Sequence, residues 1–160
     1  MDYIQLLQKR IQNVNESSIE SSLFEEFFKL EKKILEMQRH QIEQGKGFDD
    51  NNLDSGSTLF KGEYAPSTSN FASLSGNSLT SKTAGNKYNF VWTGDFMGNF
   101  RMKRQNKGLE LFSTGTGSGD KQEFFEGYTN MFGLDTDNTA TIESEVMYYV
   151  LDKIFTKLYQ

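Results

Sequence analysis

The chain has no cysteine, and among its 160 residues it has one proline, one histidine and one tryptophan. The absence of cysteine excludes disulfides, thiolate metal sites and thiol catalysis, and a single histidine excludes a histidine cluster. A protein without disulfides suits a reducing compartment. No apolar run approaches the roughly 18 residues of a membrane span, and the first residues show no apolar leader pattern. We therefore expect a protein made in the cytoplasm, with no membrane partner.

The hydrophobic residues that are present are largely aromatic. There are 14 Phe and 7 Tyr, so bulky rings have to supply much of the buried surface. A length of 160 residues fits one domain. The 22 acidic and 17 basic side chains give a net charge of −5, which disfavours a dedicated nucleic-acid binder.

The N-terminal part, residues 1–44, has the apolar periodicity of two helices. Ser17 and Glu20 have capping-box spacing and predict the start of the second helix, which we expect to continue to Gly45. The apolar stripes of the two predicted helices are formed by Ile4, Leu7, Ile11 and Val14, and by Leu23, Phe27, Leu30, Ile34 and Met37.

More than half of residues 45–86 are Ser, Thr, Asn or Gly, the composition of a long loop. A compact domain seldom keeps a free loop of this length, so we expect the loop either to pack on a partner or to reach out as an arm. As an arm, it would be mobile in the monomer and become ordered on assembly. The only proline, Pro66, favours a short helix that would include Phe71 and Leu74.

The last part, residues 87–160, is predicted to hold strands and one long helix. Tyr88, Phe90 and Trp92 alternate as in a strand, and residues 99–113 have the pattern of a β-hairpin. The helix is predicted to start near Asp135 to Thr139, with an apolar face of Met147, Leu151, Ile154 and Leu158, broadened by Val146, Val150 and Phe155. The expected fold class is α+β: a small antiparallel β-sheet packed by long N-terminal and C-terminal α-helices, in one domain over residues 1–160.

No pattern in the chain indicates catalysis. The glycine-rich segment from Gly115 to Lys121 lacks the spacing and the hydroxyl of a phosphate loop. Glu25 and Glu26 belong to an ordinary charged helix surface, and His40 has no second ligand at metal spacing. We therefore expect no enzyme, no catalytic residue, no cofactor and no metal site.

A basic cluster lies beside Phe100 in the first half of the predicted hairpin and extends into its turn; it consists of Arg101, Lys103, Arg104 and Lys107. It suits contact with DNA phosphates that is not base-specific, contact with an acidic neighbouring subunit, or a solvated strand face that discourages edge pairing.

Two short motifs mark sharp turns. Thr93-Gly94-Asp95-Phe96 follows the aromatic alternation, and Phe132-Gly133-Leu134 precedes the last helix; both place a glycine where the chain changes direction. A helical N-terminal part, a Tyr-Ala-Pro segment, the first motif, a hairpin and the second motif occur in this order. In this the chain resembles the tail-completion or head–tail joining (neck connector) proteins of tailed phages, most closely those of Bacteroidetes-type hosts, over about residues 60–160.

The resemblance implies a structural virion subunit that forms a homo-oligomeric ring at the neck or tail and is assembled in the host cytoplasm. Its implied partners are other copies of itself and the portal and tail proteins. The resemblance also implies that Thr93, Gly94, Asp95, Phe96, Phe132, Gly133 and Leu134 define the fold and lie near interfaces. The alternative function is a nucleic-acid-associated binding module that uses the basic hairpin, residues 100–107.

Overall fold

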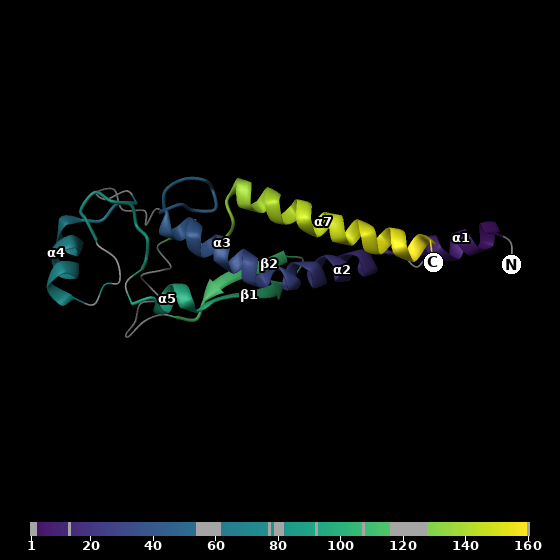
Figure 1. The fold of residues 1–160 in the computed structure, drawn as a ribbon, viewed down its shortest axis with the longest axis horizontal. Coiled ribbons are helices and arrows are strands. Elements are labelled where there is room, and N and C mark those ends of the chain that lie inside the picture. Colours follow the sequence, from purple (N-terminus) through teal and green to yellow (C-terminus); the bar gives the residue numbers. More distant parts are fainter. Residues whose placement is uncertain are drawn as a thin grey trace. The chain divides into compact units, whose positions relative to one another are not determined.

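The computed structural model describes residues 3–12, 14–53, 62–76, 78, 82–91, 93–106, 108–115 and 128–159. It has the expected α+β fold, with helices and one two-stranded antiparallel sheet (Figure 1). Two compact units divide it: residues 1–32 with 139–160, and residues 33–138. In chain order the elements are α1 (Tyr3–Gln12), α2 (Glu16–Lys29), α3 (Glu31–Glu43), α4 (Pro66–Ser75), α5 (Asp95–Gly98), β1 (Phe100–Gln105), β2 (Gly108–Ser113) and α7 (Thr136–Tyr159).

The N-terminal part contains three helices where the sequence predicts two. The break falls at Leu30, whose backbone N–H is shared among carbonyls of the preceding turn, so that α2 ends and α3 starts at the next residue. The predicted capping box is also wrong, because the cap of α2 is Asn15. Its side chain accepts a hydrogen bond of 2.8 Å from the N–H of Ser18.

The C-terminal helix α7 begins in the predicted place. Asp135 caps it by accepting a hydrogen bond of 2.9 Å from the N–H of Asn138. Its buried stripe is formed by Ile142, Val146 and Val150. The predicted apolar face lies one step around the helix, where Met147 and Leu151 are exposed. No helix in the described ranges is long and apolar enough to cross a membrane.

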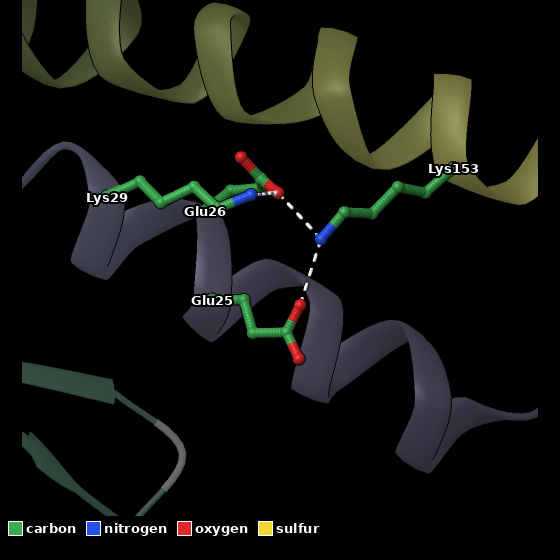
Figure 2. A network of polar contacts seen from close by, with 4 residues as sticks. All are labelled: Glu25, Glu26, Lys29 and Lys153. Atoms are coloured by element: carbon green, nitrogen blue, oxygen red, sulfur yellow. Dashed lines mark hydrogen bonds and ion pairs between the residues drawn. The ribbon is translucent and has the colours of Figure 1, made fainter.

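A polar network ties α7 to α2 within the first unit (Figure 2). The Lys153 ammonium lies 2.7 Å from Glu26 Oε1 and 2.9 Å from Glu25 Oε2, and Lys29 lies 2.8 Å from the same Glu26 oxygen. These hydrogen bonds lower the pKa of both carboxyl groups and raise the pKa of Lys153. Glu26 is buried, so its charge depends on these two lysines. The glutamates that the sequence pattern assigned to an ordinary helix surface therefore join two helices.

The second unit is built on aromatic packing. T-shaped and tilted ring pairs form a continuous path through it, with centroids 4.7–6.0 Å apart. The path runs through Tyr64, Tyr88, Tyr128, Phe90, Phe96, Phe100 and Phe132. Such pairs add to the free energy gained from apolar burial alone. The expectation that rings carry the burial is therefore met here.

The predicted hairpin is confirmed. Strand β1 pairs with β2 from Phe100 opposite Ser113 to Gln105 opposite Gly108. Phe100 and Met102 are buried on one face, whereas Arg101 and Lys103 are exposed on the other. Period-two alternation therefore places the basic side chains on the solvated face.

The strand predicted at Tyr88, Phe90 and Trp92 is wrong for the residues that can be checked. Lys87 forms a single β-bridge with Glu63, and no strand follows it through Val91; Trp92 lies outside the described residues. Phe90 has φ +51°, which an extended strand does not allow. The side chain of Asn89 accepts a hydrogen bond from the N–H of Val91 at 3.2 Å. The alternating rings are buried by a kinked segment, not by a strand.

The described parts of residues 45–86 are not a free arm, contrary to the sequence-based expectation. Leu53 is fully buried, and Asn130 donates hydrogen bonds to Asp49 Oδ1 at 2.9 Å and to the Asn52 carbonyl at 3.1 Å. At the other end, the Tyr64 N–H donates to the Asn86 carbonyl at 2.8 Å. Helix α4 forms as predicted, with Phe71 and Leu74 exposed. Residues 54–61, 77 and 79–81 lie outside the described part.

Candidate functional site

The first motif, Thr93 to Phe96, forms a turn that opens the short helix α5. Gly94 has φ +83° and ψ −9°, a left-handed conformation that disfavours any residue with a Cβ. The Asp95 N–H lies 3.5 Å from the hydroxyl of Thr93, and Asp95 Oδ1 accepts a hydrogen bond of 3.0 Å from the Asn99 side chain. The exposed Asp95 carboxylate therefore fixes the turn locally, while Phe96 is buried.

The second motif, Phe132 to Leu134, is a turn that requires glycine for two reasons, its backbone conformation and the close approach of a neighbouring side chain. Gly133 has φ +145°, and a Cβ at this position would lie 2.8 Å from the Cβ of Phe48. Phe132 and Leu134 are half-buried on either side of it. The chain can make this turn only because position 133 has no side chain.

The structure brings the two motifs together. The ring of Phe96 lies 6.0 Å from that of Phe132 and 5.1 Å from that of Phe100, and Phe100 lies 5.9 Å from Phe132. Helix α3 covers this cluster with Arg39, whose guanidinium is 5.9 Å from the Phe100 ring centroid. Arg39 Nε also donates to the Met97 carbonyl at 2.7 Å. We call Phe96, Phe100 and Phe132 the aromatic triad.

Two buried glutamines of α3 hold the second motif, and sequence reasoning missed both. Gln38 donates to the Met131 carbonyl at 2.9 Å and accepts from the Gly133 N–H at 2.8 Å. Gln41 donates to the Gly133 carbonyl at 3.0 Å and accepts from the Asp135 N–H at 2.8 Å. Each side-chain amide donates one hydrogen bond to the backbone of this turn and accepts one from it, as a neighbouring β-strand would. The signal in the sequence is a pair of glutamines three residues apart inside an otherwise apolar helix face.

The basic cluster lies on the hairpin and is partly neutralised. Lys103 forms an ion pair of 3.2 Å with Glu110 across the sheet, and its ammonium lies 4.9 Å from the Phe112 ring centroid. Arg101 donates to the carbonyl of Phe100 at 2.8 Å, and Arg104 is exposed near the turn. Lys107 lies outside the described residues. Among the described residues of the cluster, Arg101, Lys103 and Arg104 are all exposed.

A buried lysine lies at the other end of the ring path. Lys82 donates to the Val91 carbonyl at 2.7 Å and to the Asn89 side chain, and its ammonium is 5.2 Å from the Tyr64 ring centroid. Burial lowers the pKa of Lys82 to about 8. Its contacts anchor the kinked segment after Lys87. In the described ranges, no group of three or more acidic or histidine side chains is arranged to hold a metal ion.

No family model, no curated protein and no solved structure matches this chain. The candidate site therefore consists of two glycine turns that are joined through the aromatic triad, with an exposed arginine-bearing hairpin next to them.

Proposed function

We propose that this chain is a structural virion subunit of a tailed bacteriophage, a ring-forming head–tail connector (neck) or tail-completion protein. The observation that carries the proposal is the pair of motifs, Thr93–Phe96 and Phe132–Leu134. They occur in the order that the resembling phage proteins have, and each contributes one ring to the aromatic triad. In this role the motifs define the fold and perform no chemistry.

Oppositely charged surfaces support a ring. A ring of identical subunits needs two different, complementary patches on each copy. The hairpin offers the exposed Arg101 and Arg104, whereas α7 offers the exposed acidic residues Asp137 and Asp152, which lie about 60° apart around the helix. The arginine-bearing face of one copy can therefore meet the acidic helix of its neighbour, with the portal and tail proteins above and below the ring.

The exposed arginines also favour a second candidate function, a nucleic-acid-associated module. The ion pair between Lys103 and Glu110 weakens this candidate, because it neutralises one cation and adds a carboxylate that repels phosphate. Retention of the purified protein on a DNA column discriminates the two functions. Salt-dependent retention that disappears in the Arg101→Ala, Lys103→Ala double variant favours the nucleic-acid module, and passage through the column at physiological salt favours the structural subunit.

A phage that lacks this chain tests the proposal directly. Without the protein, we expect DNA-filled heads and separate tails to accumulate, as seen by electron microscopy. Supplying the wild-type chain or Asp95→Asn from a plasmid should restore joined particles, whereas Gly94→Val should not, because it misdirects the chain from Phe96 to Phe100. Normal numbers of infectious, joined particles without the chain would contradict the proposal.

A further inference from the structure

The outer face of α7 is apolar and carries no charge along most of the helix. Met147 is 47% exposed, Tyr148 70%, Leu151 44% and Phe155 53%. At about 100° per residue these four lie within an arc of about 100°. From Ala140 to Tyr159, no Asp, Glu, Lys or Arg falls in that arc. The buried stripe of Ile142, Val146 and Val150 lies on a different side, so α7 has more apolar surface than the first unit covers.

The spacing on this outer face is that of a coiled-coil seam. Positions 140, 144, 147, 151, 154 and 158 alternate in steps of four and three, the repeat that keeps a stripe facing a second helix. They are occupied by Ala140, Ser144, Met147, Leu151, Ile154 and Leu158, of which the first four are exposed and the last two half-buried. The one hydroxyl in the seam is already satisfied, because Ser144 Oγ donates to the Thr141 carbonyl at 3.1 Å. The seam can therefore be buried without leaving a polar group unpaired.

Size and charge along the seam specify what fits it. If a second α7 runs antiparallel, centred near Tyr149, Ala140 faces Leu158, Ser144 faces Ile154 and Met147 faces Leu151. Small residues then meet large ones. The same alignment brings Glu143 of one copy beside Lys157 of the other, twice by symmetry; both side chains are exposed. A parallel pair would set Ala140 and Ser144 against themselves and give neither charge a partner of opposite sign.

We propose that the outer face of α7 is a self-association surface, on which α7 of a second copy packs antiparallel to form a two-fold dimer. The helix is already held beside α2 by Lys153, so it need not fold on binding (Figure 2). Because this contact joins identical surfaces, it is distinct from the head-to-tail contact of a ring and stands without the proposed function.

Single-cysteine variants test the geometry, because the chain contains no cysteine of its own. In the antiparallel dimer the two copies of residue 148 lie close to the two-fold axis. The two copies of residue 158 lie about 27 Å apart along the helices, at 1.5 Å per residue. A short bismaleimide crosslinker should therefore join Tyr148→Cys to itself and fail to join Leu158→Cys to itself. A mixture of Ala140→Cys and Leu158→Cys should give the mixed dimer.

Charge reversal tests the register. Lys157→Glu should raise the dimer dissociation constant about tenfold, measured by analytical ultracentrifugation, since it turns two attractive contacts into repulsive ones. The swap Glu143→Lys with Lys157→Glu should restore the wild-type value. Asp152→Lys, a reversal outside the seam, should leave it unchanged, and circular dichroism should show equal helix content in all variants.

Three results would each overturn the proposal: a monomer throughout the micromolar range, self-linking of Leu158→Cys, or a dimer that does not respond to Lys157→Glu. None of them bears on whether the chain is a virion subunit, which the particle experiment decides separately.

Discussion

At the scale of single residues, the two motifs depend on glycines with a left-handed backbone, and Gly94 offers the cleaner test of that dependence. Its left-handed backbone predicts that Gly94→Ala lowers the free energy of unfolding by about 1–2 kcal/mol. Gly98 in the same short helix is the matched control, because a Cβ there meets no atom within 4 Å. Gly98→Ala should be neutral or slightly stabilising. Urea denaturation of both variants measures the difference, and equal stability would refute the backbone argument.

The neighbouring Asp95 separates a structural motif from a catalytic one. Its carboxylate accepts a hydrogen bond from Asn99, and an asparagine at this position keeps the accepting oxygen. Asp95→Asn should therefore change the free energy of unfolding by less than about 0.5 kcal/mol and leave particle assembly intact. A variant that folds normally but yields no infectious particles would show that the charge itself is required.

Gln38 makes the strongest prediction about stability. Gln38→Leu keeps the volume but leaves the Met131 carbonyl and the Gly133 N–H without this partner. At about 1–3 kcal/mol for each of the two orphaned groups, the loss should be about 2–6 kcal/mol. The control is Gln44→Leu, just beyond α3, because the exposed Gln44 side chain forms a hydrogen bond with the exposed His40 one turn earlier. Similar melting temperatures for the two variants would contradict the role assigned to Gln38.

At the scale of elements, the network between α2 and α7 predicts a pH dependence. The pKa values of Glu25 and Glu26 are lowered, so their contribution is present above the ordinary carboxyl range and is lost as the pH falls through the folded values. The pKa of Lys153 is raised, so its contribution is present below the unfolded lysine pKa and is lost as the pH rises beyond it. The network therefore stabilises the fold most between about pH 5 and pH 10.

Lys153→Met removes the shared cation of that network. Near neutral pH it should cost about 1–3 kcal/mol through Glu26, which is buried and keeps only Lys29. The deficit relative to wild type should shrink at both pH extremes. Lys9→Met, on an exposed lysine of α1, is the control. Thermal melts across the pH range measure the effect, and a deficit that does not vary with pH would contradict the network.

The sequence predicts the elements that have strong local periodicity. The predictions are wrong where contacts between distant residues determine the backbone conformation. The hairpin at residues 99–113, the helix after Pro66 and the start of α7 follow from alternation, proline placement and capping. The segment at Tyr88 to Val91 alternates like a strand, but the ring packing with Tyr64 and Tyr128 and the positive φ of Phe90 override that pattern. Local patterns do not encode such partners.

The candidate site shows the same limit. Both glycine motifs are visible as turns in the sequence, but their contact through the aromatic triad joins residues from separate segments. The hydrogen bonds of Gln38 and Gln41 to the second motif join residues more than 90 positions apart. The apolar stripe Met147, Leu151, Ile154 and Leu158 is also visible, but only the structure shows that Met147 and Leu151 face solvent.

At the scale of the whole molecule, the chain exposes several apolar side chains and a pair of arginines that could contact other proteins. The exposed face of α7 and the exposed Phe71 and Leu74 of α4 are apolar, and the hairpin exposes two arginines on a protein of net charge −5. Exposed apolar surface of this kind marks contacts with other proteins. These surfaces agree with the proposed role as an assembly subunit.

The most direct test of the proposed virion role is electron cryomicroscopy of purified virions of a phage whose genome encodes this chain. We predict a ring between the portal and the tail tube into which this fold fits, with the aromatic triad inside each subunit and the arginine-bearing hairpin at a subunit boundary. Intact virions in which mass spectrometry finds none of this chain, and whose neck density is fully explained by other proteins, would contradict the account.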